Sequence, residues 1–163
     1  HKPVPRYRDG FVVTAPRSDK GSLVGRAFPQ PMVQRLDGAR VRLDDVLGSR
    51  LALVGLVPGV AEALGPRLAA RLRAHGGAVV QGHVPPAYRR AGQLDPETRS
   101  GSAPGGTDVI DVYDFDGGLR DLHLARPADE VYVVRPDRYV AAACSLGELD
   151  DVLGRLLGLL GSG

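Results

Sequence analysis

The fold of this chain is decided by the stretch Leu51-Ala52-Leu53-Val54-Gly55-Leu56, an apolar run typical of a strand buried on both faces of a sheet. Pro58-Gly59 ends the run. Apolar residues then recur with a four-residue repeat, which predicts one face of a helix. Gly76-Gly77 ends that helix, and residues 78–84 predict a second strand. The order strand, helix, strand therefore predicts two parallel neighbouring strands joined by a right-handed crossover.

The segment before this unit predicts a β-hairpin and a short helix. Two β-capable runs flank Asp37-Gly38, a pair that suits the two positive-φ positions of a type I′ turn. The residues from Asp44 to Leu47 predict a helical turn that Asp44 caps and that Gly48 ends in the left-handed conformation. Pro66 lies inside the main helical pattern, so we expect it in the first turn of that helix, where a missing N–H costs little.

The segment after the unit predicts a second hairpin and a final helix. Residues 130–135 and 138–144 are rich in β-forming side chains and surround the turn Arg135-Pro136-Asp137. Ser145-Leu146-Gly147-Glu148 has the spacing of a capping box. With a short helix at 119–124, these elements predict an α/β, thioredoxin-like fold: β-hairpin, βαβ, short helix, ββα, with a mixed sheet and helices on both faces. The N-terminal hairpin resembles the peroxiredoxin elaboration of that fold.

Composition divides the chain into regions. Residues 1–27 are rich in Pro, Arg, Gly and Ser without a sustained period, so they predict an extended connector. Residues 28–163 carry the predicted elements and form the domain. Within them, residues 85–107 predict a long irregular loop, because Pro and Gly recur throughout, with a short helix at 87–93.

Charge and hydropathy exclude several classes of protein. The 163 residues carry a net charge of +2 and the basic residues are dispersed, which argues against a nucleic-acid partner. No apolar run reaches the ~18 residues that a membrane span needs, and the N-terminus lacks the apolar core of a signal peptide. The single cysteine, Cys144, permits neither an internal disulfide nor a cysteine zinc site, and it fits a cytoplasmic location.

The turn after the first core strand lacks redox chemistry. In a thioredoxin-like fold a cysteine at this turn is activated by the helix N-terminus, but Val57-Pro58-Gly59-Val60 contains no Cys, Ser or Thr. His75, His83 and His123 lack metal-ligand spacing, and no glycine-rich phosphate loop stands between a strand and a helix. We therefore assign no catalytic, cofactor-binding or metal-binding residue to this chain.

Two other features favour structural roles. Asp111, Asp114 and Asp116 cluster around Phe115, but the calcium-loop pattern is incomplete, so we expect turn-forming, solvated carboxylates. Cys144 lies at the predicted end of the last strand, beside a helix start. It is either a small apolar residue, which is the interpretation we favour, or the thiol of a single-cysteine redox protein.

Three motifs carry a resemblance to a known family: Phe28-Pro29-Gln30-Pro31, the segment from Leu43 to Gly48, and Arg135-Pro136-Asp137-Arg138-Tyr139-Val140. Their order and spacing resemble the C-terminal domain of FAD-dependent aromatic hydroxylases, of the type that acts on 3-(3-hydroxyphenyl)propionate or polyketide rings. The segment from Pro5 to Gly10 resembles that family's exit from the catalytic region. The resemblance extends to Leu160 and implies the C-terminal part of a longer enzyme.

The family's chemistry is carried by upstream domains, which bind FAD and substrate. Reduced flavin reacts with O₂, and the hydroperoxide hydroxylates an aromatic ring with NAD(P)H as reductant. None of the family's FAD motifs occurs in this sequence. The resemblance therefore implies a non-catalytic domain that serves docking, stability or oligomerisation, while FAD and NAD(P)H belong to the parent protein. The alternative is a free-standing thioredoxin-fold binding protein that lacks redox cysteines.

The resemblance also suggests interface residues. Phe28, Pro29 and Pro31 would pack against the catalytic portion, with the N-terminal connector between the two. The alternative is that these residues close the domain's own core. Arg135 and Tyr139 are candidates for a homodimer contact, because buried Tyr and Arg often anchor interfaces.

Overall fold

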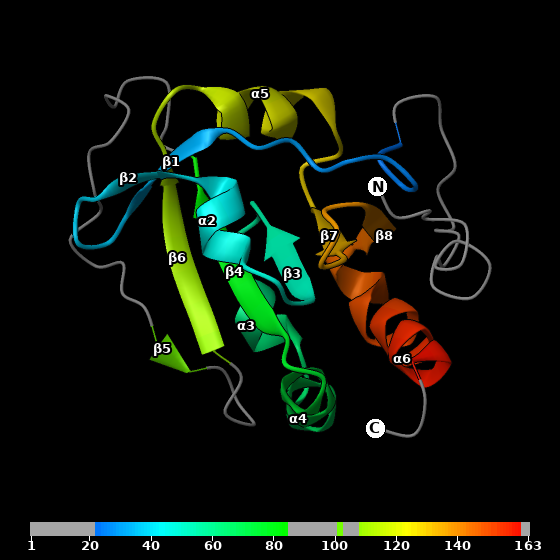
Figure 1. Ribbon diagram of the computed structural model, residues 1–163. Helices are drawn as coiled ribbons and strands as arrows, with labels where there is room; N and C mark the ends of the chain where they lie inside the picture. The colour runs from blue at the N-terminus through cyan, green and yellow to red at the C-terminus, as the bar shows by residue number, and fades with distance from the viewer. Residues whose placement is uncertain (1–21, 85–100, 103–107, 161–163) are drawn as a thin grey trace.

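The sheet is mixed, and its strands run in the order β2-β1-β6-β4-β3-β7-β8, with β5 paired to β6 (Figure 1). The computed structural model describes residues 22–84, 101–102 and 108–160. The strands are β1 (Met32–Arg35), β2 (Arg40–Arg42), β3 (Ala52–Gly55), β4 (Ala78–His83), β5 (Gly101–Ser102), β6 (Asp108–Asp114), β7 (Glu130–Val134) and β8 (Val140–Ser145). The helices are α2 (Leu43–Leu47), α3 (Val60–Ala63), α4 (Pro66–Ala74), α5 (Gly118–Ala125) and α6 (Leu149–Leu159), which the 3₁₀ turn η1 (Leu146–Glu148) precedes.

β3 lies between β4 and β7, and all of its residues are buried. It runs parallel to β4, with Leu53 opposite Val79, and antiparallel to β7, with Leu53 opposite Val133. The structure therefore confirms the predicted strand buried on both faces and the predicted parallel pair. It also confirms the second hairpin, in which β7 and β8 are antiparallel.

β6 extends the parallel part of the sheet beyond β4, with Asp111 opposite Gln81. The other edge of β6 pairs with β5 near its start and with β1 near its end. β5 falls within the span 85–107 that the sequence predicts to be irregular. The rest of that span, including the predicted helix at 87–93, lies outside the described residues.

Helices cover both faces of the sheet, as predicted (Figure 1). One core joins α3, α4 and α6 to the sheet, and the other joins α2 and α5 to its opposite face. Members of the first core are Leu53, Val60, Leu72, Val133, Leu153 and Leu156. Members of the second are Phe28, Leu43, Val54, Leu119 and Tyr132. Each face of the sheet is therefore covered by helices through an apolar core.

The main crossover helix is interrupted. α3 is a single turn, Leu64 after it is extended, and α4 begins at Pro66, which occupies its first turn as predicted. The break has a local cause, because proline disfavours helical geometry in the residue before it, here Gly65 with ψ 155°. Val60 and Leu72 remain buried in the same core despite the break.

The first hairpin does not have the predicted type I′ turn. Gly38 has a φ of 90°, but among the described residues Arg138 is the one non-glycine residue with positive φ, so Asp37 is not left-handed. Gly38 N–H donates to Arg35 O at 2.9 Å, and Arg35 N–H donates to Ala39 O at 2.8 Å. The loop is therefore a three-residue connection that ends in a left-handed residue. The Asp37 carboxylate explains the difference, because it accepts the Ala39 N–H at 2.9 Å.

Asp114 holds the start of α5. It is fully buried, and it accepts the N–H groups of Gly117 at 3.0 Å, Leu119 at 3.2 Å and Arg120 at 3.3 Å. Asp116 accepts the N–H of Gly118 at the same turn at 2.8 Å and the N–H of Met32 at the start of β1 at 3.0 Å. The predicted turn-forming role is confirmed for both carboxylates, but the predicted solvation is wrong for Asp114, because its bonds to the helix start require burial.

Removal of the Asp114 carboxylate should destabilise the domain. Asp114→Ala leaves three backbone N–H groups without their acceptor, and we expect a loss of about 2 kcal/mol or more in the free energy of unfolding. Urea denaturation followed by circular dichroism measures this loss. Asp121→Ala, an exposed substitution on the same helix, is the matched control and should change stability by less than about 0.5 kcal/mol. Equal effects of the two substitutions would contradict the capping role.

Candidate docking site

The β7–β8 turn is built like the first hairpin loop, with one change. Arg138 N–H donates to Arg135 O at 2.9 Å, and Arg135 N–H donates to Tyr139 O at 2.8 Å. The left-handed position, which Gly38 fills in the first loop, is held here by Arg138 with a φ of 75°. A non-glycine residue in this region is uncommon, so the side chain at position 138 calls for an explanation.

Asp137 is fixed inside the turn by Arg135. The Nε of Arg135 donates to Asp137 Oδ1 at 3.0 Å, its Nη2 donates to the other carboxylate oxygen, and Tyr139 N–H donates to Oδ1 at 3.2 Å. Partial burial raises the pKa of Asp137, but the hydrogen bonds from Arg135 and the Tyr139 N–H and the charge of Arg135 outweigh it, so the pKa is lowered overall. Arg135 is itself buried, and its guanidinium lies 5.6 Å from the centre of the Tyr139 ring.

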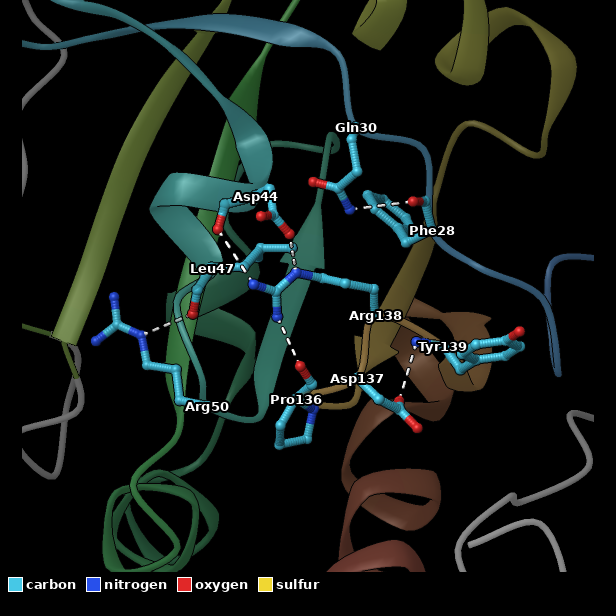
Figure 2. A network of polar contacts seen from close by, with 9 residues as sticks. All are labelled: Phe28, Gln30, Asp44, Leu47, Arg50, Pro136, Asp137, Arg138 and Tyr139. Atoms are coloured by element: carbon cyan, nitrogen blue, oxygen red, sulfur yellow. Dashed lines mark hydrogen bonds and ion pairs between the residues drawn. The ribbon is translucent and has the colours of Figure 1, made fainter. Parts of the chain in front are cut away.

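Arg138 reaches from the turn to α2. Its Nε bonds the Asp44 carboxylate, its Nη2 donates to Asp44 O at 3.3 Å, and its Nη1 donates to Pro136 O at 2.8 Å. Figure 2 shows the guanidinium between Asp44 and Pro136, with the Tyr139 ring on the opposite side of the turn. The predicted cap role of Asp44 is wrong, because the N-cap of α2 is Arg42 and the Asp44 carboxylate is bonded to Arg138 instead. Gly48 ends α2, as predicted, with a φ of 61°, but its ψ of −157° is not that of the predicted left-handed helical conformation.

The chain before β1 runs along this turn. Ala27 forms a bridge with Tyr139, and Phe28 N–H donates to Arg138 O at 2.7 Å. The Phe28 ring is buried beneath the segment, with its centre 5.3 Å from that of Tyr132. Pro31 O accepts the N–H of Leu43 at the start of α2 at 2.9 Å.

The five residues that the sequence predicts as interface candidates differ in exposure. Phe28 and Arg135 are buried within the domain, and Phe28 belongs to one of its cores, as in the alternative interpretation of that residue. Pro29 is exposed, and Pro31 and Tyr139 are half-buried. A role of Pro29, Pro31 and Tyr139 in an interface stays a prediction.

The turn after β3 is closed by Gln81 from β4. The Gln81 Nε2 donates to Val57 O at 2.9 Å, and its Oε1 accepts the Val60 N–H at 3.2 Å. Gln81 is buried, and α3 has only four residues. The turn therefore presents neither a thiol nor a free N–H at Val60. Sequence reasoning missed Gln81, whose signal was a polar side chain within an apolar run.

A short polar row continues from Gln81 along the same face of the sheet. His83 Nε2 lies 2.9 Å from Asp111 Oδ1, and the His83 ring stacks on Tyr113 with 4.7 Å between centres. The strand register brings these residues together, since Asp111 is opposite Gln81 and Tyr113 is opposite His83. Asp111 is buried rather than solvated, contrary to expectation. Within the described residues, no group of three or more His, Cys, Asp or Glu side chains could hold a metal ion.

Cys144 is buried in β8 against the α6 face of the sheet. Burial, together with the charges of Glu148, Glu130 and Asp129, raises the pKa of its thiol to about 12. Glu148 belongs to the predicted capping box, which the structure confirms. The helix start therefore brings a carboxylate towards the thiol, which favours the apolar interpretation of Cys144 over the redox one.

The sheet is thioredoxin-like, and the turn after β3 holds the Gln81 amide where redox members of this fold carry a thiol. The chain is therefore a thioredoxin-fold domain without thiol chemistry at that turn. Residues 25–159 match the HcaD C-terminal domain family, and the chain belongs to that family. It is 36% identical over 135 residues to a 3-(3-hydroxy-phenyl)propionate/3-hydroxycinnamic acid hydroxylase of Paraburkholderia xenovorans, covering 83% of this chain and 20% of that protein. It is 33% identical to the hydroxylase of the same name from Mycobacterium avium, covering 98% of this chain and 25% of that protein.

The chain thus spans about a fifth to a quarter of the length of the curated relatives it matches. Solved structures support the fold alone. A thioredoxin domain of a thiol-disulfide oxidoreductase from Bacteroides vulgatus has a TM-score of 0.54 at 14% identity, covering 86% of this chain and 96% of that one. A peroxidoxin from Mycobacterium tuberculosis has a TM-score of 0.53 at 14% identity, covering 85% of this chain and 98% of that one. Among the helices described here, none combines the length and apolar character that crossing a membrane requires.

The native thiol of Cys144 should be almost unreactive. With its pKa raised from 9.0 to about 12, the thiolate fraction at pH 8 falls on the order of a thousandfold, and burial slows attack further. We expect negligible reaction with Ellman's reagent in native buffer and prompt, stoichiometric reaction in urea. Ser49→Cys in a Cys144→Ser background places a thiol at an exposed position and is the matched control. Rapid reaction of native Cys144 would revive the single-thiol redox alternative.

Asp137 should contribute stability that is lost in acid. Because its pKa is lower in the folded protein than the ordinary value of 3.8, its contribution is fully present above that value and is lost as pH falls through the lowered one. Urea denaturation from about pH 5 to about pH 2.5 should therefore show a flatter profile for Asp137→Asn than for the parent. Asp37→Asn, at the corresponding place in the other hairpin, is the control. Parallel profiles for Asp137→Asn and the parent would contradict this assignment.

Proposed function

We propose that this chain is the non-catalytic C-terminal domain of an FAD-dependent monooxygenase that hydroxylates an aromatic substrate with NAD(P)H and O₂. The observation that carries the proposal is the match of residues 25–159 to a C-terminal domain family, together with relatives named as hydroxylases that are several times longer. FAD, NAD(P)H and the substrate are assigned to upstream domains of the same polypeptide. The proposed location is cytoplasmic.

The closed turn after β3 supports a role without chemistry. Where the fold elsewhere uses a thiol at a helix start, Gln81 spans the turn and bonds both Val57 and Val60. The buried Cys144, with its raised pKa, does not supply the missing thiolate. We therefore assign this domain to docking and stability, not to a step of the reaction.

The proposed docking surface consists of Pro29, Pro31 and Tyr139, supported from below by Phe28 and Arg135. Two of the three are prolines, whose fixed φ lowers the entropy cost of ordering the segment against a partner. Residues 1–27 are proposed to be the linker from the catalytic region, and the partner is that region of the same chain. A homodimer contact through Tyr139 is the alternative occupant of this surface.

The intact mass of the native protein tests the proposal. An antibody to this domain should detect, in the source cells, a yellow, FAD-containing species several times larger than the 17.2 kDa of this chain. A native species of about 17.2 kDa would overturn the proposal and favour a free-standing binding protein.

The docking surface is tested in the longer protein by Pro29→Asp. A carboxylate buried against the catalytic region should lower the midpoint temperature of its unfolding, since an unpaired buried charge is costly. Leu124→Asp, at an exposed position on α5, is the matched control. No shift with Pro29→Asp would contradict docking at this surface, and loss of dimers without such a shift would favour the homodimer alternative.

A further inference from the structure

Three segments that lie far apart in the sequence meet at Arg138. Its carbonyl accepts the Phe28 N–H at 2.7 Å, and its guanidinium bonds both the carboxylate and the carbonyl of Asp44 in α2. Its Nη1 donates to Pro136 within its own turn. One residue therefore joins Phe28, α2 and the β7–β8 turn, and Figure 2 shows its contacts with Asp44 and Pro136.

Backbone bonds hold the connector at a second point. Gly25 N–H donates to Val140 O at 2.9 Å, and Val140 N–H donates to Arg26 O at 2.9 Å. The segment from Val24 to Phe28 is therefore fastened along the first residues after the turn, and we call this segment the strap. The strap bonds to backbone atoms of the turn and β8, so its position depends on how firmly the turn itself is held.

α2 is bonded both to the turn and to the chain after the strap. The Leu43 N–H at its start donates to Pro31 O at 2.9 Å, and Asp44 beside it bonds Arg138. The contacts therefore form a closed ring from the strap to the turn, from the turn to α2, and from α2 back to the chain after the strap. The other contacts named in this ring are backbone hydrogen bonds, whereas the Asp44–Arg138 contact is made by side chains and can be removed by substitution.

The backbone of Arg138 also points to a role for its side chain. Gly38 makes the equivalent loop of the first hairpin, where glycine adopts positive φ without strain, whereas Arg138 adopts a φ of 75°. A residue held in a disfavoured conformation is retained only when the surrounding contacts determine it. The contact that glycine could not make is the one between the guanidinium and α2.

We propose that the Asp44–Arg138 pair is a lock that holds the strap against the β7–β8 turn, and with it the position of Ser22 relative to the rest of the domain. Its consequence rests on the proposed function: the position of Ser22 fixes the point at which the linker to the catalytic region joins this domain. The Asp44 and Arg138 side chains are 48% and 21% exposed, so the lock is accessible to water and salt.

Hydrogen exchange on the 163-residue chain tests the lock. Asp44→Asn removes the charge, and Arg138→Asn removes the guanidinium while keeping a residue that tolerates positive φ. In both variants we expect the Phe28 and Gly25 N–H groups to exchange about three- to tenfold faster, with Leu53 in β3 unchanged.

Asp151→Asn is the matched control, because it breaks the exposed pair with Arg155 on α6, away from the strap. It should leave the exchange of Phe28 and Gly25 unchanged. Unchanged exchange at these two residues in both lock variants would overturn the proposal. So would equal acceleration at Leu53, because the pair would then contribute to general stability and not to the strap.

The position of Ser22 is tested by a distance between spin labels at Ser22→Cys and Leu124→Cys in a Cys144→Ser background. The distribution should be narrow in the parent and broad in Asp44→Asn, and equal widths would overturn the proposal. Both measurements use this chain alone. A native species of 17.2 kDa would overturn the proposed function, but it would not change the exchange rates or the label distances. Failure of the proposed function and failure of the lock are therefore distinguishable.

Discussion

The burial of β3 on both faces and along both edges is the constraint on which the rest of the structure depends. Its edges are satisfied by β4 and β7, and its side chains need an apolar layer above and below, so helices must cover both faces. Gly55 at its end sets how closely α3 can approach, because a Cβ there would lie 2.3 Å from Cγ2 of Val60. Close packing of Gly55 against Val60 therefore holds the turn after β3, in addition to the polar contacts of Gln81.

Features with a local chemical cause could be predicted from the sequence. The buried strand, the second hairpin, the capping box and the place of Pro66 follow from periodicity, turn chemistry and capping, which act over a few residues. Contacts that depend on register could not. Asp44 bonds Arg138, 94 residues away, and the Gln81 clamp depends on how two parallel strands are aligned. The motifs that resemble the hydroxylase family flagged the right segments, but nothing in them indicated which side chains face each other.

Proteins with this fold differ in whether the turn after the first core strand carries a reactive thiol. Neighbours in fold include a peroxidoxin and a thiol-disulfide oxidoreductase, whereas relatives in sequence are named as hydroxylases. In this chain the turn that carries a thiol in redox members is fastened by an amide, and polar contacts gather instead where the chain enters the domain. Family membership and the closed turn agree, since neither assigns thiol chemistry to this turn.

The burial of Cys144 has a consequence for how the domain reacts with oxidants. Peroxides and disulfides attack the thiolate, and this chain keeps its sole thiol protonated within the sheet. A thiol held in this way is protected from oxidation by peroxide and from disulfide exchange with other redox proteins for as long as the domain stays folded.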